Sequence, residues 1–149
     1  MHRRQSVPRQ WLIVNAQPDR ELWDALRRLQ RESGVLVLVE LRGADRRWLL
    51  VLARRQELTV AHNGRAERVH NVRELRRAML RRTPLILLSP IYPTRSHPEW
   101  RPLPRMRAAA LAHLGRQKLV ALGGMDARKF ARVRRLGFQG WAGISAFRT

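Results

Sequence analysis

Residues 87–98 have the sequence LLSPIYPTRSHP, in which an apolar run opens into a turn of proline and small hydroxyl residues. The same pattern returns as VALGGMD over residues 120–126 and as GWAGISA over residues 140–146. Each segment between these runs is long enough for one helix. Apolar runs that alternate with helices are typical of parallel βαβ units. Because active sites of such folds lie at the carboxyl ends of the strands, we expect function in these turns.

The length of the chain predicts one domain. A domain of 149 residues (1–149) buries about 70% of its unfolded surface. The absence of cysteine excludes disulfides, thiolate metal sites and a cysteine nucleophile. No apolar run approaches the roughly 20 residues that span a bilayer. The basic N-terminus is not followed by the apolar segment of a signal peptide. We therefore expect a cytoplasmic protein without a membrane partner, in which residues 1–9 are flexible.

The charge of the chain is strongly positive. A net charge of +20 is typical of nucleic-acid-binding proteins. However, only Lys118 and Lys129 among the 31 basic residues are lysines, and the arginines are dispersed as pairs over predicted helix faces. This pattern favours a solvated arginine-rich surface, with a nucleic-acid face as the alternative. A positive field also attracts phosphorylated metabolites.

Hydrophobic patterning predicts eight strands. They cover residues 11–16, 35–41, 48–53, 58–61, 68–70, 85–89, 118–122 and 139–144. Asp19, Asn71 and Asp126 have the side chains of helix N-caps, and Pro104 suits the first turn of a further helix. The sequence therefore alternates between strands and helices over most of its length.

Eight strands predict a TIM-type (β/α)8 barrel, although about 250 residues are typical of that fold. The missing length falls in the N-terminal half, where residues 42–47 and 54–57 are too short for parallel crossovers of a dozen or more residues. We therefore predict a shortened barrel that lacks several helices in the N-terminal half. The alternative is a partly open α/β sheet with an antiparallel hairpin at residues 35–52.

Gly123 and Gly124 stand between a predicted strand and the helix that Asp126 would cap. Glycines let the backbone approach an anion closely, and a helix N-terminus attracts negative charge. Phosphate sites after strands seven and eight are frequent in TIM barrels. These features favour a phosphate site here over the alternative, a tight turn without a ligand.

The three motifs together resemble the thiamine phosphate synthase family, which includes the thiazole tautomerases. The likeness is close over residues 68–147 and loose over residues 10–42. It implies a TIM-barrel transferase of thiamine biosynthesis. Such an enzyme couples hydroxymethylpyrimidine pyrophosphate to thiazole phosphate and releases pyrophosphate with the help of Mg²⁺.

The resemblance also implies site residues. The thiazole phosphate would be bound by residues after the last three strands, which are Thr94, Ser96, Gly123, Gly124, Gly143, Ile144 and Ser145. Two residues are candidates for catalysis. His97 stands where the family commonly has lysine, and Arg42 stands in the region that would bind pyrophosphate. A protonated imidazole beside a phosphate can donate a proton, and the alternative for His97 is an ordinary loop histidine.

The pyrophosphate half departs from the family pattern. The signature Gln-Leu-Arg-Glu-Lys is represented by Glu40-Leu41-Arg42, with Ala44 at the lysine position. The Asn-Asp pair expected after the third strand would fall on residues 52–55, which read LARR, and residues 61–63 contain no aspartate. Because Mg²⁺ prefers carboxylate oxygens, we predict no metal site built by the protein and Mg²⁺ binding only with a pyrophosphate ligand.

Two other functions therefore stay open beside the synthase. One is a degenerate thiazole tautomerase-like or non-catalytic phosphate-binding protein. The other, from a different class, is a basic nucleic-acid-associated protein. For the synthase and for the degenerate or non-catalytic relative, the expected partner is a small phosphorylated metabolite.

A barrel without several helices leaves apolar strand faces uncovered. The candidate exposed residues are Val37, Val39, Trp48, Leu50 and Leu52. Monomers seldom expose apolar patches larger than a few hundred Å², and unpaired strand edges invite pairing. We therefore predict a twofold homodimer. The alternative is that arginine side chains cover this surface with their apolar stems.

Overall fold

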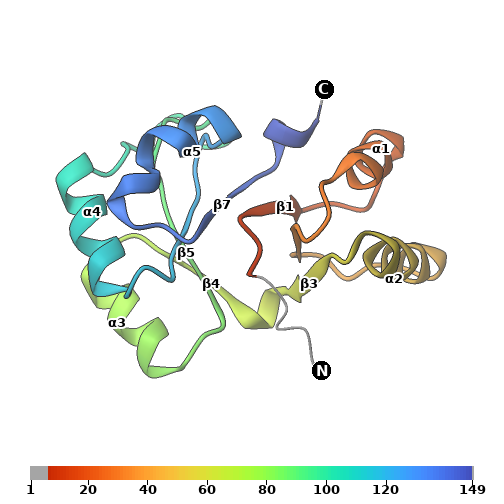
Figure 1. The fold of residues 1–149 in the computed structure, drawn as a ribbon, viewed down its shortest axis with the longest axis horizontal. Coiled ribbons are helices and arrows are strands. Elements are labelled where there is room, and N and C mark those ends of the chain that lie inside the picture. The colour runs from red at the N-terminus through yellow and green to blue at the C-terminus, as the bar shows by residue number, and fades with distance from the viewer. Residues whose placement is uncertain (1–6, 149) are drawn as a thin grey trace.

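The computed structural model describes residues 7–148, without the side chain of Ser145, and forms a nearly closed barrel of seven parallel strands (Figure 1). The strands are β1 (Gln10–Val14), β2 (Gly34–Val37), β3 (Thr59–His62), β4 (Ala66–Val69), β5 (Leu85–Leu88), β6 (Val120–Ala121) and β7 (Gly140–Gly143). Their order in the sheet is β3-β2-β1-β7-β6-β5-β4. The two edges of the sheet are therefore β3 and β4. The predicted shortened TIM-type barrel is confirmed.

Helices connect most of the strands. They are α1 (Arg20–Arg28), α2 (Ala44–Gln56), α3 (Val72–Leu80), α4 (Arg105–Leu114) and α5 (Ala127–Val133), with short 3-10 helices η1 (Asn63–Arg65), η2 (Arg134–Leu136) and η3 (Ser145–Phe147). The three predicted caps are confirmed: the side chains of Asp19, Asn71 and Asp126 accept from the N–H groups of Leu22, Glu74 and Lys129. Among residues 7–148, no helix has both the length and the apolar character of a membrane span.

The sheet separates three hydrophobic clusters. Leu22 and Leu26 of α1 pack with Leu49 of α2 on the outer face of β1, β2 and β3. The helices α3, α4 and α5 cover the outer face of the remaining strands, on the other side of the molecule (Figure 1). The third cluster fills the barrel interior, and its buried members are Trp11, Ile13, Leu36, Leu85, Leu87, Val120 and Ala142. The barrel interior is therefore an apolar core, and Ile13, Leu36, Leu87 and Ala142 of this cluster also line the cavity described below.

The prediction of a strand at residues 48–53 was wrong, because this segment lies within α2. An apolar run of this length fits a buried strand or a helix equally well. In the helix, Leu49 is buried against α1, whereas Trp48 and Leu50 are exposed. The hairpin alternative for residues 35–52 is also wrong, since α2 leads from β2 into β3 and these strands pair in parallel.

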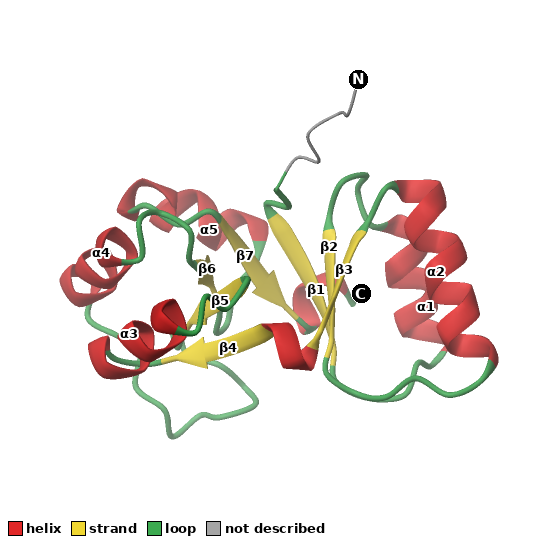
Figure 2. Ribbon diagram, turned by 90° about the horizontal axis from the view of Figure 1, so that it is seen from below, coloured by secondary structure: helices red, strands yellow, loops and turns green. Residues whose placement is uncertain are grey.

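The missing length lies at one seam of the barrel. β3 continues into β4 through η1 alone, whereas every other pair of consecutive strands is separated by a helix. Figure 2 shows this connection as a sharp corner between the two edge strands. A complete (β/α)8 barrel has a helix, a strand and a second helix between two such strands. The chain therefore lacks one helix–strand–helix segment and keeps the helices on both sides of it.

The helices reduce the surface available to the predicted homodimer. Val37 is only 2% exposed, because it lies beneath α1 and α2, whereas Trp48 is 59% and Leu50 is 51% exposed. The dimer stays a prediction, now centred on these two residues of α2. We expect sedimentation equilibrium at micromolar concentration and high salt to give a dimer. We expect Trp48→Glu to give a monomer, because the substitution places a charge in the buried interface.

The control for this experiment is Val72→Glu, which puts the same charge on another exposed apolar residue, at the start of α3. The control protein should remain dimeric. A monomeric wild-type protein would contradict the prediction and would show that the exposed part of α2 is tolerated in water.

Candidate functional site

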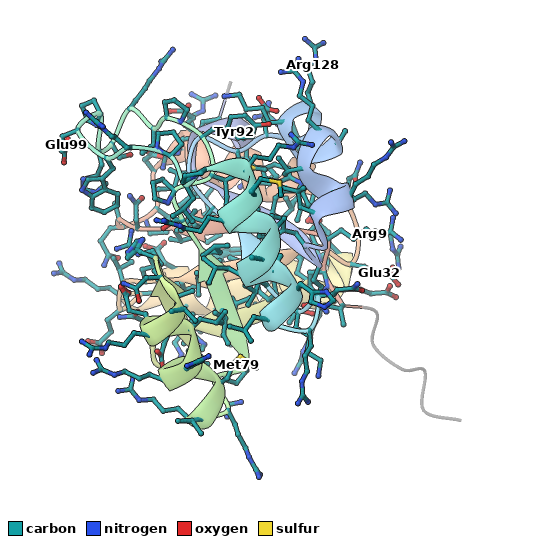
Figure 3. The ribbon with its side chains drawn as sticks, turned by 90° about the vertical axis from the view of Figure 1, so that its left-hand side faces the viewer. Arg9, Glu32, Met79, Tyr92, Glu99 and Arg128 are labelled. Atoms are coloured by element: carbon teal, nitrogen blue, oxygen red, sulfur yellow. The ribbon has the colours of Figure 1, made fainter. Side chains whose placement is uncertain are left out.

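The carboxyl ends of the strands open into a cavity of approximately 780 Å³. Figure 3 shows that Glu99, in the loop after β5, lies on the opposite side of the molecule from Arg9 and Glu32, which precede strands. The cavity belongs to the side of Glu99, because His97 and Trp100 of the same loop line it. Its volume lies within the roughly 300–1,000 Å³ that is typical of small-molecule sites.

Most residues predicted for the site lie together in this cavity. Its lining includes Thr94, Ser96, His97, Gly123, Gly124, Gly143 and Ile144. Ser145 begins η3, and its side chain lies outside the described part of the chain. The structure places Arg42 elsewhere. Arg42 is exposed in the loop before α2, its carbonyl oxygen accepts from the N–H of Asp45, and it is absent from the described lining.

The turn after β6 is held against the loop after β5. The N–H groups of Ile91 and Tyr92 donate to the carbonyl oxygens of Leu122 and Gly123. Gly123 and Gly124 have φ angles of +106° and +57°, and a Cβ atom on Gly124 would collide with the carbonyl oxygen of Pro93. The packing of the two loops therefore requires glycine at residue 124, before any ligand is considered.

The same turn also offers hydrogen-bond donors. Within residues 7–148, the N–H groups of Gly123 and Gly124 donate to no protein acceptor. Because both residues line the cavity, these groups are available to an anion. The two interpretations of the glycine pair are thus compatible, since a turn required by packing also exposes backbone donors.

Lys129 completes this corner of the cavity, and the sequence analysis did not identify it. Its Nζ donates to the carbonyl oxygen of Gly124 at 3.0 Å and lies 5.3 Å from the centre of the Tyr92 ring. Its backbone N–H donates to the Oδ1 of Asp126 at 2.7 Å, which caps α5. These contacts fix the ammonium group beside the glycine turn. The signal in the sequence is the rarity of lysine in a chain rich in arginine.

His97 is held by an aromatic partner. Its ring is stacked on Trp100, with 3.8 Å between ring centroids and an angle of 9° between the planes. Its Nδ1 lies 3.4 Å from the Oε1 of Glu99. The stack and the carboxylate together orient the imidazole at the wall of the cavity, where Trp100 also contributes to the lining.

Trp100 also contacts His70, which lies between β4 and α3. The two rings meet edge-on, with 5.8 Å between their centroids. The Nδ1 of His70 donates to the carbonyl oxygen of Ser89 at 2.7 Å. Thr94 accepts from the N–H of Ser96 through its Oγ1 at 3.3 Å. The loop after β5 is therefore tied to the barrel through His70 and through the N–H groups of Ile91 and Tyr92, and it carries about half of the polar side chains that line the cavity.

The lining residues do not fit a Mg²⁺ site. Asp126 is the single carboxylate among the described lining residues, and its Oδ1 already caps α5. Residues 7–148 contain no group of three His, Asp or Glu side chains that could hold a metal ion. Mg²⁺ requires several oxygen ligands in octahedral geometry. The protein alone therefore does not supply the coordination that the pyrophosphate half of the resemblance implies.

The placement of the expected Asn-Asp pair at residues 52–55 was wrong, because those residues belong to α2. The third strand of the barrel ends at His62 and is followed by Asn63 and Gly64. The resemblance then implies Asn63, which lines the cavity, at the asparagine position of the pair and Gly64 at the aspartate position. The carboxylate is therefore still missing after this correction.

Comparison with known proteins identifies the family of the chain. A family model described as thiamine monophosphate synthase matches residues 68–147, which is more than half of the chain. The chain belongs to this family. The matched segment runs from β4 to η3 and contains all three motif turns. The resemblance inferred from the sequence is therefore confirmed.

A structural comparison extends the likeness of this thiamine monophosphate synthase family member to the whole barrel. Its fold is similar to that of a thiamine phosphate pyrophosphorylase from Pyrococcus furiosus, with a TM-score of 0.68 and 14% sequence identity. The match covers 93% of this chain and 86% of the other chain. No curated protein sequence matches the chain. At this identity the structural likeness establishes the fold alone.

Proposed function

We propose that the protein binds a thiazole phosphate at the barrel mouth, with the phosphate group at the turn formed by residues 122–125. The observation that carries this proposal is the position of Lys129, whose ammonium is fixed 3.0 Å from the carbonyl oxygen of Gly124. Beside it are the two backbone N–H groups of the glycine pair. A phosphate group is bound by positive charge and by hydrogen-bond donors that are already in place. Hydrogen bonds between charged groups are stronger than those between neutral groups.

The proposed activity is restricted to the thiazole phosphate half of the family reaction. The turn formed by residues 122–125 lines the cavity together with Thr94 and His97. The described lining residues lack the several carboxylates that would bind Mg²⁺. We therefore propose a member of the family that recognises the thiazole phosphate in thiamine metabolism without the metal-assisted coupling step.

A second candidate function is a proton transfer on the bound thiazole, as in a tautomerase. The orientation of His97 favours it. With Nδ1 directed to Glu99 and the ring stacked on Trp100, Nε2 is the nitrogen left for a ligand. Histidine exchanges protons near neutral pH, so it can remove a proton from one ring position and return it to another. This step consumes no co-reactant.

We predict that the protein binds thiazole phosphate in calorimetric titrations without added metal. The unphosphorylated thiazole alcohol should bind at least about tenfold more weakly, because it lacks the charged group that Lys129 and the turn would contact. Addition of Mg²⁺ and pyrophosphate should leave the affinity for thiazole phosphate unchanged.

Two outcomes would contradict the proposal. Equal affinities for the phosphate and the alcohol would show that the turn binds no anion. Efficient formation of thiamine phosphate from thiazole phosphate and hydroxymethylpyrimidine pyrophosphate with Mg²⁺ would show that the protein is a complete synthase.

A further inference from the structure

The two halves of the barrel differ in charge. Residues 66–148 contain 18 arginines and lysines against four carboxylates, whereas residues 7–65 contain 11 against seven. In the more basic half, α3, α4 and α5 cover one side of the barrel, which Figure 3 shows with α4 in the middle. The fold therefore gives the side of these helices a much larger positive charge than the side of α1 and α2.

The four carboxylates of the basic half are engaged elsewhere. Glu67 and Glu74 have partners on or beside α3. Glu99 lies beside His97 at the mouth of the barrel, and Asp126 caps α5. The residues that form α4, α5 and η2 include no aspartate or glutamate at all. The positive charge of these three elements is therefore not balanced by carboxylates of their own.

We call the outer surface of α4, α5 and η2 the α4–α5 face. Its parts adjoin, because the guanidinium of Arg105 donates to the carbonyl oxygen of Arg132 at 3.1 Å and η2 packs against α4. The exposed arginines of the face are Arg105, Arg107, Arg128, Arg132, Arg134 and Arg135.

These six arginines repel one another. None of them forms an ion pair with a carboxylate of residues 7–148, whereas arginines elsewhere in the chain, among them Arg31 and Arg81, do. The surfaces of solvated helices commonly carry charges of both signs. A face with one sign of charge is stabilised when a partner of the opposite sign neutralises it.

We propose that the α4–α5 face binds the phosphate backbone of a duplex nucleic acid, a function separate from the phosphate site proposed at the barrel mouth. α4 has ten residues and is therefore about 15 Å long. A duplex carries one negative charge per about 1.7 Å, so about nine phosphate charges lie along this length. A duplex can therefore contact most of the six arginines at once, and the planar guanidinium group matches phosphate oxygens in a bidentate manner.

The other side chains of the α4–α5 face favour a duplex over other anionic partners. Phe130 is the single Phe, Tyr or Trp of α4, α5 and η2, and it is buried. Single-stranded nucleic acids stack their bases on exposed aromatic side chains, and protein partners bind aromatic anchors. Met106 and Leu114 are exposed at opposite ends of α4, so they form no continuous apolar strip that could enter a membrane. The face therefore fits an array of phosphates, which carries no base sequence.

The test is fluorescence anisotropy with two labelled duplexes of the same arbitrary sequence, one of DNA and one of RNA. We expect at least one duplex to bind, with an affinity that falls steeply between about 50 and 200 mM salt. If six phosphates are contacted, the slope of the logarithm of the association constant against the logarithm of the salt concentration is about −5. The duplex that binds more tightly identifies the preferred nucleic acid.

A triple variant removes half of the arginines of the α4–α5 face and consists of Arg107→Gln, Arg128→Gln and Arg132→Gln. It should weaken binding of the duplex at least about tenfold and should reduce the salt slope by about 3, because about one unit is lost per phosphate contact. Its affinity for thiazole phosphate should be unchanged, because none of the three residues lines the cavity.

The matched control removes three arginines from α2 and consists of Arg46→Gln, Arg47→Gln and Arg54→Gln. These residues are exposed, and Figure 1 shows α2 on the other side of the barrel from α4. The control variant loses the same net charge and should keep the salt slope of the wild type. Circular dichroism and denaturant unfolding of both triple variants establish that they are folded.

Three results would overturn the inference, and each would leave the proposed function intact. The first is that neither duplex binds at about 50 mM salt, where such contacts are strong. The second is an equal loss of affinity in the two triple variants, which would assign the binding to the net charge of +20. The third is tighter binding of poly-glutamate, or of vesicles that contain phosphatidylserine, than of either duplex. That result would assign the α4–α5 face to an acidic protein or to a membrane.

Discussion

We expect Gly124→Ala to destabilise the protein by about 2–4 kcal/mol, which is a large fraction of the stability of a single domain. Two effects add at this residue. An alanine with φ near +57° lies in the left-handed region, which costs roughly 1–2 kcal/mol. Its Cβ would also collide with the carbonyl oxygen of Pro93, so the loop after β5 would have to move. Denaturant unfolding followed by far-UV circular dichroism measures the loss.

Gly64→Ala is the matched control for this substitution. Gly64 lies in η1, its φ angle is not in the left-handed region, and a Cβ there would have no atom within 4 Å. Its stability should stay within about 0.5 kcal/mol of the wild type, as for most surface substitutions. Unchanged stability and unchanged ligand affinity in Gly124→Ala would show that the two loops are not packed as the structure has them.

The C-terminal half of the fold could be predicted from the sequence because its signals agree with one another. The apolar runs at residues 85–89 and 139–144 are short, are bounded by turn residues and alternate with capped helices. Asn71 and Asp126 mark helix starts that the structure confirms. When local signals and the alternation of elements point to the same fold, the assignment is secure.

The N-terminal half was harder because one local signal was ambiguous. Residues 48–53 read WLLVLA, an apolar run without the spacing that distinguishes a helix from a buried strand. Leu49 is the single buried residue of α2, and the helix has little of the one-sided apolar pattern that identifies an amphipathic helix. The deficit in length indicated a missing segment, but its position at η1 became clear only from the pairing of β3 with β2.

The candidate site also contains some residues that local sequence signals predict and others that they do not. The glycine pair and the hydroxyl residues of the loop after β5 stand in recognisable motifs, so their place at the mouth was expected. Lys129 belongs to no motif. Its place in the cavity depends on which face of α5 it occupies, and this cannot be read from the neighbouring residues.

The second large effect is expected for Lys129→Met, which should lower the affinity for thiazole phosphate by about tenfold to a hundredfold. The substitution keeps an unbranched side chain and removes the ammonium group beside the glycine turn. Losing a hydrogen bond from a charged donor costs about 1.5–3 kcal/mol, which corresponds to that change in affinity. Calorimetric titration at constant ionic strength measures it, because a change in salt would alter the general field of so basic a chain.

Lys118→Met separates this local role from the loss of one positive charge. Lys118 is the other lysine of the chain, is exposed and precedes β6, so it lies at the end of the barrel opposite the mouth. It should bind thiazole phosphate as the wild type does. Lys129→Arg should retain part of the affinity, since it keeps the charge but changes the geometry of the donor. If Lys118→Met lost as much affinity as Lys129→Met, the phosphate would be attracted by the net charge of +20 and not bound at the turn.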